Sequence, residues 1–277
     1  MLSTSRSTLT SYTSRIVVRG EHFFFAVNGY PYHLAGEHLL RTLDYAYTYT
    51  GSADATTALV ALKDALQAGP VVAGMLDVGF LTYIPNHHQL QGSDHAVVVL
   101  ACQPDAVIVH DPEGYAAVPL PLDDFLDAWQ RDIYTGKPYG LWRIGTQGHP
   151  PHEETIWERT LTRARANFAR TAQTTADGMT LVYGPDGMRA LAADLRAMPQ
   201  RELGGLPFFS WRVSGQRCLD SALFLRERLP HAAALRWEEC QLYGMLQHAS
   251  ATQKRDALPD LLERLAEYEA CFIAMLE

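Results

Sequence analysis

Residues 92–112 read GSDHAVVVLACQPDAVIVHDP, and this stretch decides the fold of the chain. Its two apolar runs, residues 96–102 and 106–109, are separated by the three residues 103–105, which predicts a β-hairpin. The midpoint of His95 and Asp111 falls inside that turn, so the hairpin places the two side chains roughly opposite each other. An imidazole held by a carboxylate gains a fixed tautomer and raised basicity. We therefore expect His95 to be a general base that Asp111 orients, which is half of a catalytic triad.

A structural hydrogen bond between the same two residues is the alternative interpretation. Asp111-Pro112 is also an ordinary turn signal, which needs no catalytic role. The two interpretations can be distinguished by the surroundings of His95, because a triad needs a thiol or hydroxyl group within hydrogen-bond reach of His95 and a structural hydrogen bond does not.

Short apolar runs on either side of this stretch predict further strands. They lie at residues 16–18, 23–27, 71–76 and 140–144, and tyrosines at 45, 47 and 49 alternate along one face of another strand. Most runs are apolar on consecutive residues, which is typical of a sheet buried on both faces. Leucines at 59, 62 and 66 predict a helix that ends before Gly69-Pro70, and residues 122–129 predict a second helix. The first half is therefore expected to be α+β.

The second half of the sequence predicts helices. Apolar residues recur at helical spacing within residues 157–168, 219–223 and 258–275, and the charges between them are nearly balanced in sign. Residues 145–152 read GTQGHPPH, and this Gly- and Pro-rich run is typical of a linker. We predict two domains, an α+β domain at residues 1–146 and an all-helical domain at residues 152–277.

Composition excludes several classes of protein. Hydrophobic residues make up 47% and charged residues 19% of 277, which is ordinary for a globular chain. The net charge of −8 argues against nucleic-acid binding, and no apolar run approaches the roughly 20 residues that span a membrane. No secretory signal is found, and the four cysteines form neither a metal-ligand pattern nor a disulfide framework. We expect a cytoplasmic protein with no cofactor.

A resemblance to known proteins rests on this same stretch. The segment from Gly69 to Trp129, with its His95 strand and its Asp111-Pro112 strand end, resembles the papain-like fold of double-glycine leader peptidases. Residues 14–277 resemble more closely the family of the butirosin biosynthesis protein BtrH. Residues 189–195, 215–218 and 221–225 look like the helical C-terminal domain of that family.

The resemblance implies acyl transfer in natural-product biosynthesis. In that family an acyl group leaves a carrier-protein thioester and reaches an amine of a small molecule through a Cys–His–Asp site. His95 and Asp111 match the last two members, and Asp77 and Tyr83 match shared positions that are expected to line the substrate pocket. The expected partners are an acyl carrier protein and a small-molecule substrate.

The sequence departs from the family at the nucleophile. The family's cysteine lies on a first helix upstream of the segment that matches residues 23–25, but no cysteine precedes Cys102 here. Cys102 falls at the far end of the predicted strand from His95, so it is not expected to be the nucleophile. Five serines at residues 3, 5, 7, 11 and 14 are hydroxyl groups in the right region. Either the chain lacks its beginning or it works without that cysteine.

Two further interpretations stay open and two are disfavoured. His95 can act as a general base on a bound substrate without a covalent intermediate, as an acyltransferase or cyclase. A binding or assembly protein that keeps the fold without the chemistry is the alternative. A metal site at His87, His88, Asp94 and His95 is not expected, because adjacent histidines point in different directions. A cysteine peptidase is disfavoured, because no oxyanion Gln precedes a cysteine in the first 100 residues.

Overall fold

The structure is a computed structural model of the chain. It describes residues 15–19, 22–26, 32–131, 137–169, 173–174, 180–200, 203 and 206–276. Packing divides the chain into two units, one of residues 43–150 and one of residues 1–42 together with 151–277. The division at 150 lies near the predicted linker. Residues 1–42 group with the helical part, whereas the sequence prediction assigned them to the first domain.

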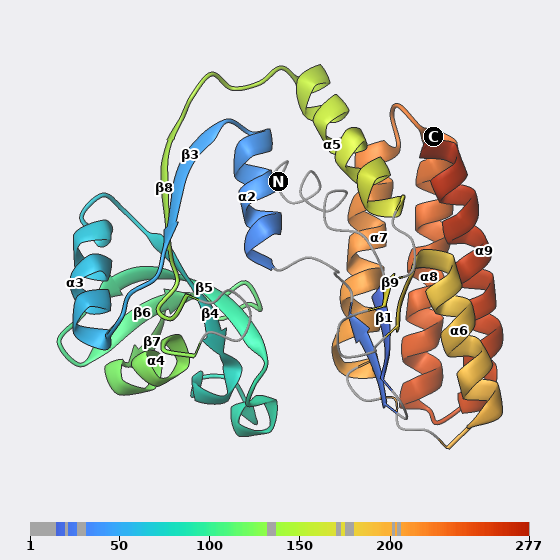
Figure 1. Cartoon of the computed structure of the whole chain (residues 1–277), viewed down its shortest axis with the longest axis horizontal. Helices are drawn as coiled ribbons and strands as arrows, with labels where there is room; N and C mark the ends of the chain where they lie inside the picture. The colour runs from blue at the N-terminus through green and yellow to red at the C-terminus, as the bar shows by residue number, and fades with distance from the viewer. Residues whose placement is uncertain are drawn as a thin grey trace. The chain divides into compact units, whose positions relative to one another are not determined.

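The sheet unit, residues 43–150, is built on one six-stranded antiparallel sheet (Figure 1). Its strand order is β3-β8-β4-β5-β6-β7, with Val72 of β4 paired to both Val98 of β5 and Trp142 of β8. The strands are β3 (Tyr45–Thr50), β4 (Val71–Asp77), β5 (Asp94–Cys102), β6 (Ala106–His110), β7 (Val118–Pro121) and β8 (Leu141–Gln147). The α+β class predicted for this part of the chain is therefore confirmed.

Two helices complete the core of the sheet unit. They are α3 (Ala55–Leu66), which ends before Gly69 as predicted, and α4 (Leu122–Trp129). Leu62 of α3 and Phe125 of α4 belong to one buried cluster with Val97, Val99 and Val109 of the sheet. Two short 3-10 helices, η2 (Val78–Phe80) and η3 (His87–Leu90), lie in the loop between β4 and β5. That loop ends at residue 93, two positions before His95.

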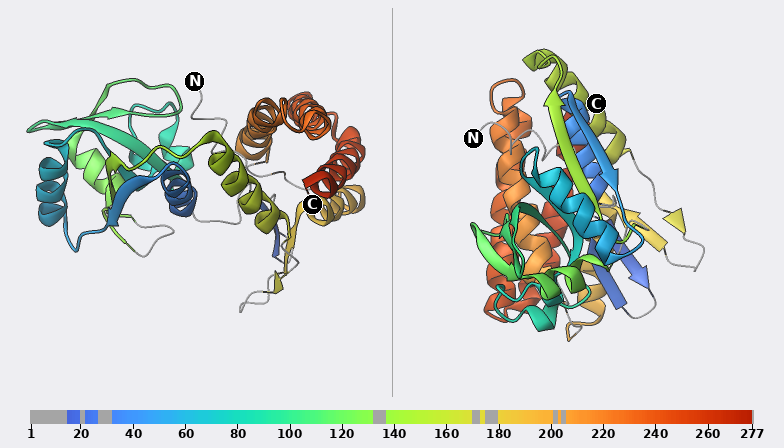
Figure 2. Two further views of the ribbon diagram at one scale, coloured as in Figure 1. Left: turned by 90° about the horizontal axis from the view of Figure 1, so that it is seen from above. Right: turned by 90° about the vertical axis from the view of Figure 1, so that its left-hand side faces the viewer.

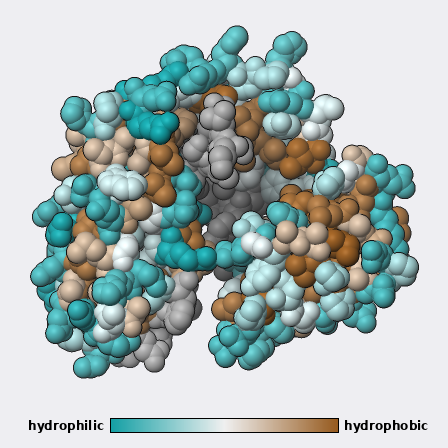
Figure 3. All heavy atoms as spheres, turned by 180° about the vertical axis from the view of Figure 1, so that it is seen from behind, coloured by the Kyte–Doolittle hydropathy of each residue, from teal (hydrophilic) through white to brown (hydrophobic). Residues whose placement is uncertain are grey.

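The sheet is buried on both faces only in part, which corrects the sequence prediction. Strand β4 is buried along nearly its whole length. In β5, Val97 and Val99 are buried, whereas Leu100 on the other face is 38% exposed. Strand β6 alternates in the same way. Figure 3 shows hydrophobic residues among hydrophilic ones on the visible face of this unit. An apolar run in the sequence therefore did not distinguish a strand that is buried on both faces from a strand with one partly exposed face.

The helical unit contains five long helices. They are α5 (Glu153–Phe168), α6 (Gly184–Ala197), α7 (Trp211–Leu225), α8 (Pro230–Ala251) and α9 (Leu258–Leu276), and α2 (Tyr32–Thr42) belongs to the same unit. The left view of Figure 2 shows α6 to α9 nearly end-on, so these helices run roughly side by side. Short helices precede two of them, the π-helix η4 (Leu206–Ser210) before α7 and η5 (Arg255–Ala257) before α9.

The region predicted as all-helical also contributes two strands. In this unit β1 (Arg15–Arg19) pairs with β2 (His22–Ala26) and with β10 (Thr180–Tyr183), and β10 pairs with β9 (Gln173–Thr174). The region is helical as predicted, but "all-helical" is wrong for β9 and β10. The pairing of β1 with β10 joins segments that lie far apart in the sequence, which explains why residues before 43 group with this unit.

The predicted helix stripes are mostly core, with two exceptions. Leu258, Leu262, Leu265 and Phe272 of α9 are buried. Met275 and Leu223 are 47% and 49% exposed, so these two residues were wrongly placed in the core. In α7 the buried positions are instead those of Trp211, Ser214, Gly215, Cys218, Ser221, Ala222 and Leu225, a face that includes small and polar residues.

A charged cluster lies inside the helical unit. The Arg236 guanidinium contacts the carboxylates of both Glu239 and Glu269, and all three side chains are at most 3% exposed. The Cys218 thiol donates to Glu239 Oε2 at 3.5 Å. One cation faces two carboxylates, and burial together with the charge of Glu269 raises the pKa of Glu239 to about 8. Burial and the neighbouring carboxylate therefore favour the protonated form of Glu239 in the folded state.

Among the described residues, no helix is both long and apolar enough to cross a membrane.

Candidate functional site

The structure brings His95 and Asp111 together. His95 Nε2 lies 2.9 Å from Asp111 Oδ2, as the hairpin predicted. The register differs from the expected one, because Val98 pairs with His110 and Val99 with Val109, followed by a bulge before Ala101. Asp111 therefore lies just beyond the end of β6, and its side chain reaches His95 diagonally. His95 itself, the second residue of β5, pairs with Leu76 of β4.

The turn after β6 fixes the position of the Asp111 carboxylate. The Glu113 N–H donates to Asp111 Oδ1 at 2.7 Å, and the Gly114 N–H donates to the Asp111 carbonyl oxygen at 3.1 Å. Gly114 has a φ of +106°, a conformation that favours glycine. The Asp111 N–H donates to the Tyr115 carbonyl oxygen. Residues 111–114 thus form a closed turn that leaves Asp111 Oδ2 facing His95.

Tyr83 is the third member of the cluster. Its hydroxyl donates to Asp111 Oδ2 at 2.6 Å, the same oxygen that His95 contacts. The Tyr83 ring meets the Tyr115 ring edge-on, with the ring centroids 5.3 Å apart. Burial, reinforced by the contact with Asp111, raises the pKa of Tyr83 far above its ordinary value. The hydroxyl therefore stays protonated and acts as a permanent donor to the carboxylate.

Asp111 is held as an anion although its side chain is fully buried. Burial alone raises the pKa of this carboxyl, but hydrogen bonds from His95, Tyr83 and the Glu113 N–H outweigh burial and lower it below the ordinary value. The His95 side chain is 16% exposed, so the imidazole has one side on the carboxylate and another open to solvent. The imidazole thus combines a fixed anionic partner with access from solvent.

This arrangement defines the tautomer of His95. A carboxylate is an acceptor only, so Nε2 carries the proton and donates it to Asp111. In the neutral ring, Nδ1 is then the nitrogen with a lone pair. Within the described residues Nδ1 makes no hydrogen bond. His95 can therefore accept a proton at Nδ1 while Asp111 holds the opposite side of the ring.

Asp77, predicted to line the substrate pocket, organises the loop that leads to His95. Asp77 Oδ1 accepts hydrogen bonds from the Gly79 N–H at 2.8 Å and the Gly92 N–H at 2.9 Å. His87 Nδ1 in turn donates to the Gly79 carbonyl oxygen at 2.6 Å. The Asp77 side chain is 1% exposed, and Arg131 Nη1 lies 3.8 Å from its other oxygen. Asp77 thus ties both ends of residues 79–92 to the end of β4.

Asp77 and Tyr83 both bond within the protein, and their contact with a substrate stays a prediction. The sequence reasoning missed Tyr115, the Glu113 N–H and Arg131. The Glu113 N–H follows from the Asp-Pro-Glu-Gly turn at residues 111–114, which is a sequence signal for an aspartate that binds its own backbone. Arg131 packs over the Phe80 ring, 4.7 Å from its centroid, and no local sequence pattern indicates that contact.

No thiol near His95 takes the place of the missing nucleophile within the sheet unit. Cys102 is the last residue of β5 and pairs with Val107, at the opposite end of the strand from His95. The other three cysteines belong to the helical unit. The serines at residues 3, 5, 7, 11 and 14 lie outside the described residues.

The histidines near the site have partners other than a metal. His95 contacts Asp111 and His87 contacts Gly79, while the His87 and His88 rings meet edge-on. Over the part of the chain that the structure describes, no group of three or more His, Cys, Asp or Glu residues is arranged to hold a metal ion.

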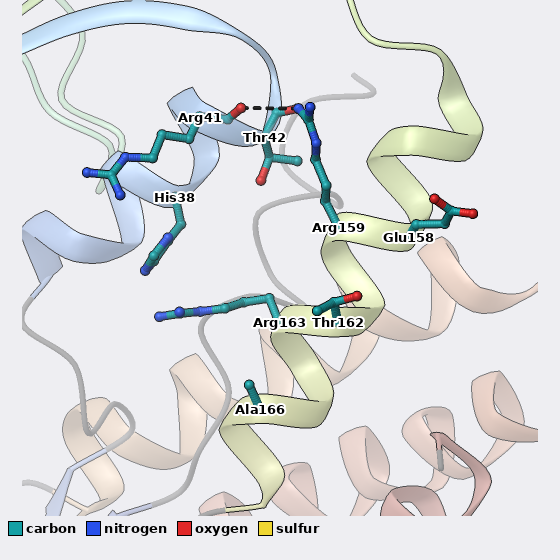
Figure 4. Close-up of a pocket in the computed structure, with 8 residues that line it drawn as sticks. All are labelled: His38, Arg41, Thr42, Glu158, Arg159, Thr162, Arg163 and Ala166. Carbon is teal, nitrogen blue, oxygen red and sulfur yellow. Dashed lines mark hydrogen bonds between the residues drawn. The ribbon is translucent and has the colours of Figure 1, made fainter.

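A pocket of about 620 Å³ lies in the helical unit between α2 and α5 (Figure 4). Its lining includes His38 and the cationic residues Arg41 and Arg163, none of which sequence reasoning selected. Arg159 donates to the carbonyl oxygens of Arg41 and Thr42 and so caps the C-terminus of α2. Burial, together with Arg163 and Arg41, lowers the pKa of His38, which keeps this ring neutral at pH 7. Arg159 thus links α5 to the end of α2.

Comparison with known proteins relates the chain to YobF. Residues 178–277 match the family model described as the YobF C-terminal domain, and this range spans β10 and α6 to α9. The chain is 27% identical over 215 residues to an uncharacterized protein YobF from Bacillus subtilis (strain 168), a match that covers 76% of this chain and 69% of that protein. The C-terminal part of the chain is thus similar to a YobF domain, and the relation to the BtrH family, which these comparisons do not support, stays a prediction from the sequence.

Proposed function

We propose that the sheet unit has a papain-like arrangement and that the protein catalyses acyl transfer, or thioester-driven amide formation or cyclisation, in natural-product biosynthesis. The observation that carries the proposal is the 2.9 Å contact between His95 Nε2 and the buried Asp111 carboxylate. Asp111 orients the ring and His95 is the general base. The expected acyl donor is a thioester on an acyl carrier protein, and the acceptor is an amine of a small molecule.

The chemistry needs no covalent intermediate on the protein. The nitrogen of the acceptor amine attacks the thioester carbonyl carbon, and His95 Nδ1 takes a proton from that amine. The C–N bond forms, the C–S bond breaks, and the protonated imidazole returns its proton to the leaving thiolate. The products are an amide and a free thiol, and no cofactor takes part. The buried Asp111 anion stabilises the transient imidazolium, which is where a carboxylate partner contributes to the rate.

The alternative, a non-catalytic binding or assembly protein on the same fold, is favoured by one observation. Asp111 Oδ2 already accepts from Tyr83, and Oδ1 accepts from the Glu113 N–H. A carboxylate with this many donors can have a purely structural role, in which it joins β5, the turn after β6 and the loop before β5. The two functions differ in whether His95 takes part in turnover.

The test presents the full-length protein with model acyl N-acetylcysteamine thioesters and a panel of primary amines. Amide formation is followed by mass spectrometry. The proposal expects amide above the uncatalysed rate, and it expects prior alkylation of the cysteines to leave that rate unchanged. Absence of amide with every donor and acceptor places the binding function first. Loss of turnover on alkylation contradicts the mechanism without a thiol.

A further inference from the structure

The pocket between α2 and α5 gathers basic side chains from both helices. On α2, His38 and Arg41 lie three positions apart, and on α5, Arg159 and Arg163 lie four positions apart. Each pair therefore falls on one face of its helix, and both faces line the same pocket. Its volume of about 620 Å³ is within the range of small-molecule sites.

The basic groups of this pocket can be reached from solvent. The side chains of His38 and Arg163 are partly buried, and that of Arg41 is 63% exposed. Figure 4 shows these three side chains extending to the same side of the view, whereas the Glu158 carboxylate lies on the side of α5 away from His38. A ligand in the pocket therefore meets the basic groups rather than the carboxylate of Glu158.

The contacts of the arginines leave the pocket positively charged. Arg159 donates to the backbone carbonyl oxygens of Arg41 and Thr42, which carry no net charge. Arg41 pairs with Glu37 at 2.9 Å, so these two charges largely cancel. With Glu37 included, the described residues of the lining place three arginines against two carboxylates. An anion is the ligand that this balance favours.

His38 reports the sign of the charge around it. The charged groups that act on its ring are Glu37 and Arg41 of its own helix and Arg163 of α5. Burial lowers the pKa of His38 most, Arg163 and Arg41 lower it further, and Glu37 raises it by less than either arginine lowers it. The surroundings of the ring thus disfavour another cation, and a bound anion would reverse that effect.

We propose that this pocket binds a small molecule through a dianionic phosphate group, with Arg163 as the main charged contact and His38 as a second contact. A guanidinium presents paired N–H donors that match the oxygens of a phosphate. The hydroxyls of Thr42 and Thr162, which also line the pocket, are further donors. A bound dianion favours protonated His38, so binding takes up a proton near neutral pH. The site belongs to the helical unit and does not involve His95.

The probes are phenyl phosphate and phenyl sulfate, which have similar shapes. At about pH 7 the phosphate ester carries nearly two negative charges and the sulfate ester carries one. The full chain is titrated with each by calorimetry at constant ionic strength. The proposal expects phenyl phosphate to bind about tenfold more tightly or better. Titration in buffers of different ionisation enthalpy should show proton uptake with phenyl phosphate, and this uptake should disappear in His38→Gln.

A matched pair of variants tests the charge of the pocket without deleting a contact. Ala166 lines the pocket three residues after Arg163, on the same face of α5. Ala166→Glu places a carboxylate next to Arg163 and is expected to weaken phenyl phosphate binding about tenfold or more. Ala166→Gln, similar in size but neutral, is the control and is expected to bind normally. Arg163→Gln should lose about 10–100-fold in affinity, with the thermal midpoint of each variant as the check on folding.

Four outcomes overturn the proposal. They are the absence of phenyl phosphate binding at millimolar concentration, equal affinity for the two esters, equal phenyl phosphate affinity of Ala166→Glu and Ala166→Gln, and unchanged proton uptake in His38→Gln. The Ala166 pair decides the matter if Arg163→Gln does not fold. Because none of these readouts involves His95, failure here is separate from failure of the acyl-transfer proposal.

Discussion

Tyr83 and His95 donate to the same oxygen of Asp111, at 2.6 and 2.9 Å. The two donors come from different segments, since Tyr83 lies in the loop after β4 and His95 is the second residue of β5. Asp111 therefore joins the loop, β5 and the turn after β6 through one carboxylate. The carboxylate that contacts His95 is therefore also held by a residue that is 28 positions away from Asp111 in the sequence.

The first prediction concerns Tyr83→Phe. The variant removes one donor to a buried anion, so we expect the free energy of unfolding to fall by about 1.5–3 kcal/mol. We also expect the acid limb of any pH–rate profile to move to higher pH, because the Asp111 pKa rises. Urea denaturation and the pH profile measure the two effects. Tyr115→Phe is the control, and an equal loss in both variants contradicts the assigned role of the Tyr83 hydroxyl.

The second prediction concerns acid stability. The folded-state pKa of Asp111 is lowered, so the unfolded chain binds more protons as the pH falls below about 4. The contribution of Asp111 to the free energy of unfolding is present above that pH, and it is lost as the pH falls through the pKa of Asp111 in the folded state. Urea denaturation at pH 2–6 should show that the free energy of unfolding falls less steeply with decreasing pH in Asp111→Asn than in the unsubstituted protein. Parallel curves for the two proteins would show that Asp111 is not held as an anion.

The third prediction concerns Glu239, whose pKa is raised to about 8 from an ordinary value of 4.5. Between these values the folded chain binds the extra proton, so the free energy of unfolding falls as the pH rises from about 5 to 8. Glu239→Gln, which is neutral throughout, should flatten this dependence. Glu238→Gln at the exposed neighbouring position is the control. If both variants keep the slope of the unsubstituted protein, Glu239 is ionised in the fold.

The fourth prediction concerns Asp77→Ala. The Gly79 and Gly92 N–H groups each lose their acceptor, so we expect the free energy of unfolding to fall by about 2–4 kcal/mol. Hydrogen exchange should speed up at residues 79 and 92 before it changes in β5. Asp105→Ala, at an exposed turn position, is the control. Unchanged exchange at both glycines would mean that Asp77 does not hold the loop.

The hairpin and the His95–Asp111 contact could be predicted because both depend on residues close in sequence. The apolar runs and Pro104 indicated the turn, although the bulge between Val99 and Ala101 shifts the register and is not visible in the pattern. The shift did not separate the pair, because Asp111 lies beyond the strand in a turn that aims its carboxylate back at His95.

The other features depend on contacts between distant segments. Nothing near Val17 indicates that it pairs with Leu181, so the sequence pattern did not join β1 to the strand that follows α5. Tyr83 could be selected by resemblance, but its bond to Asp111 depends on the loop that Asp77 holds. The exposure of Leu100 and Leu223 depends on what packs against each face, which an apolar run does not reveal.

The central claim is that His95 is the general base, and the rate of amide formation from an acyl thioester in His95→Asn tests it most directly. His110→Asn, at the exposed end of β6, is the matched control and should react at the rate of the unsubstituted protein. Loss of a general base lowers a rate by roughly 10²–10⁴-fold, so we expect a loss of that size in His95→Asn with the folded structure retained. A folded His95→Asn variant that forms amide at the unsubstituted rate would contradict the account.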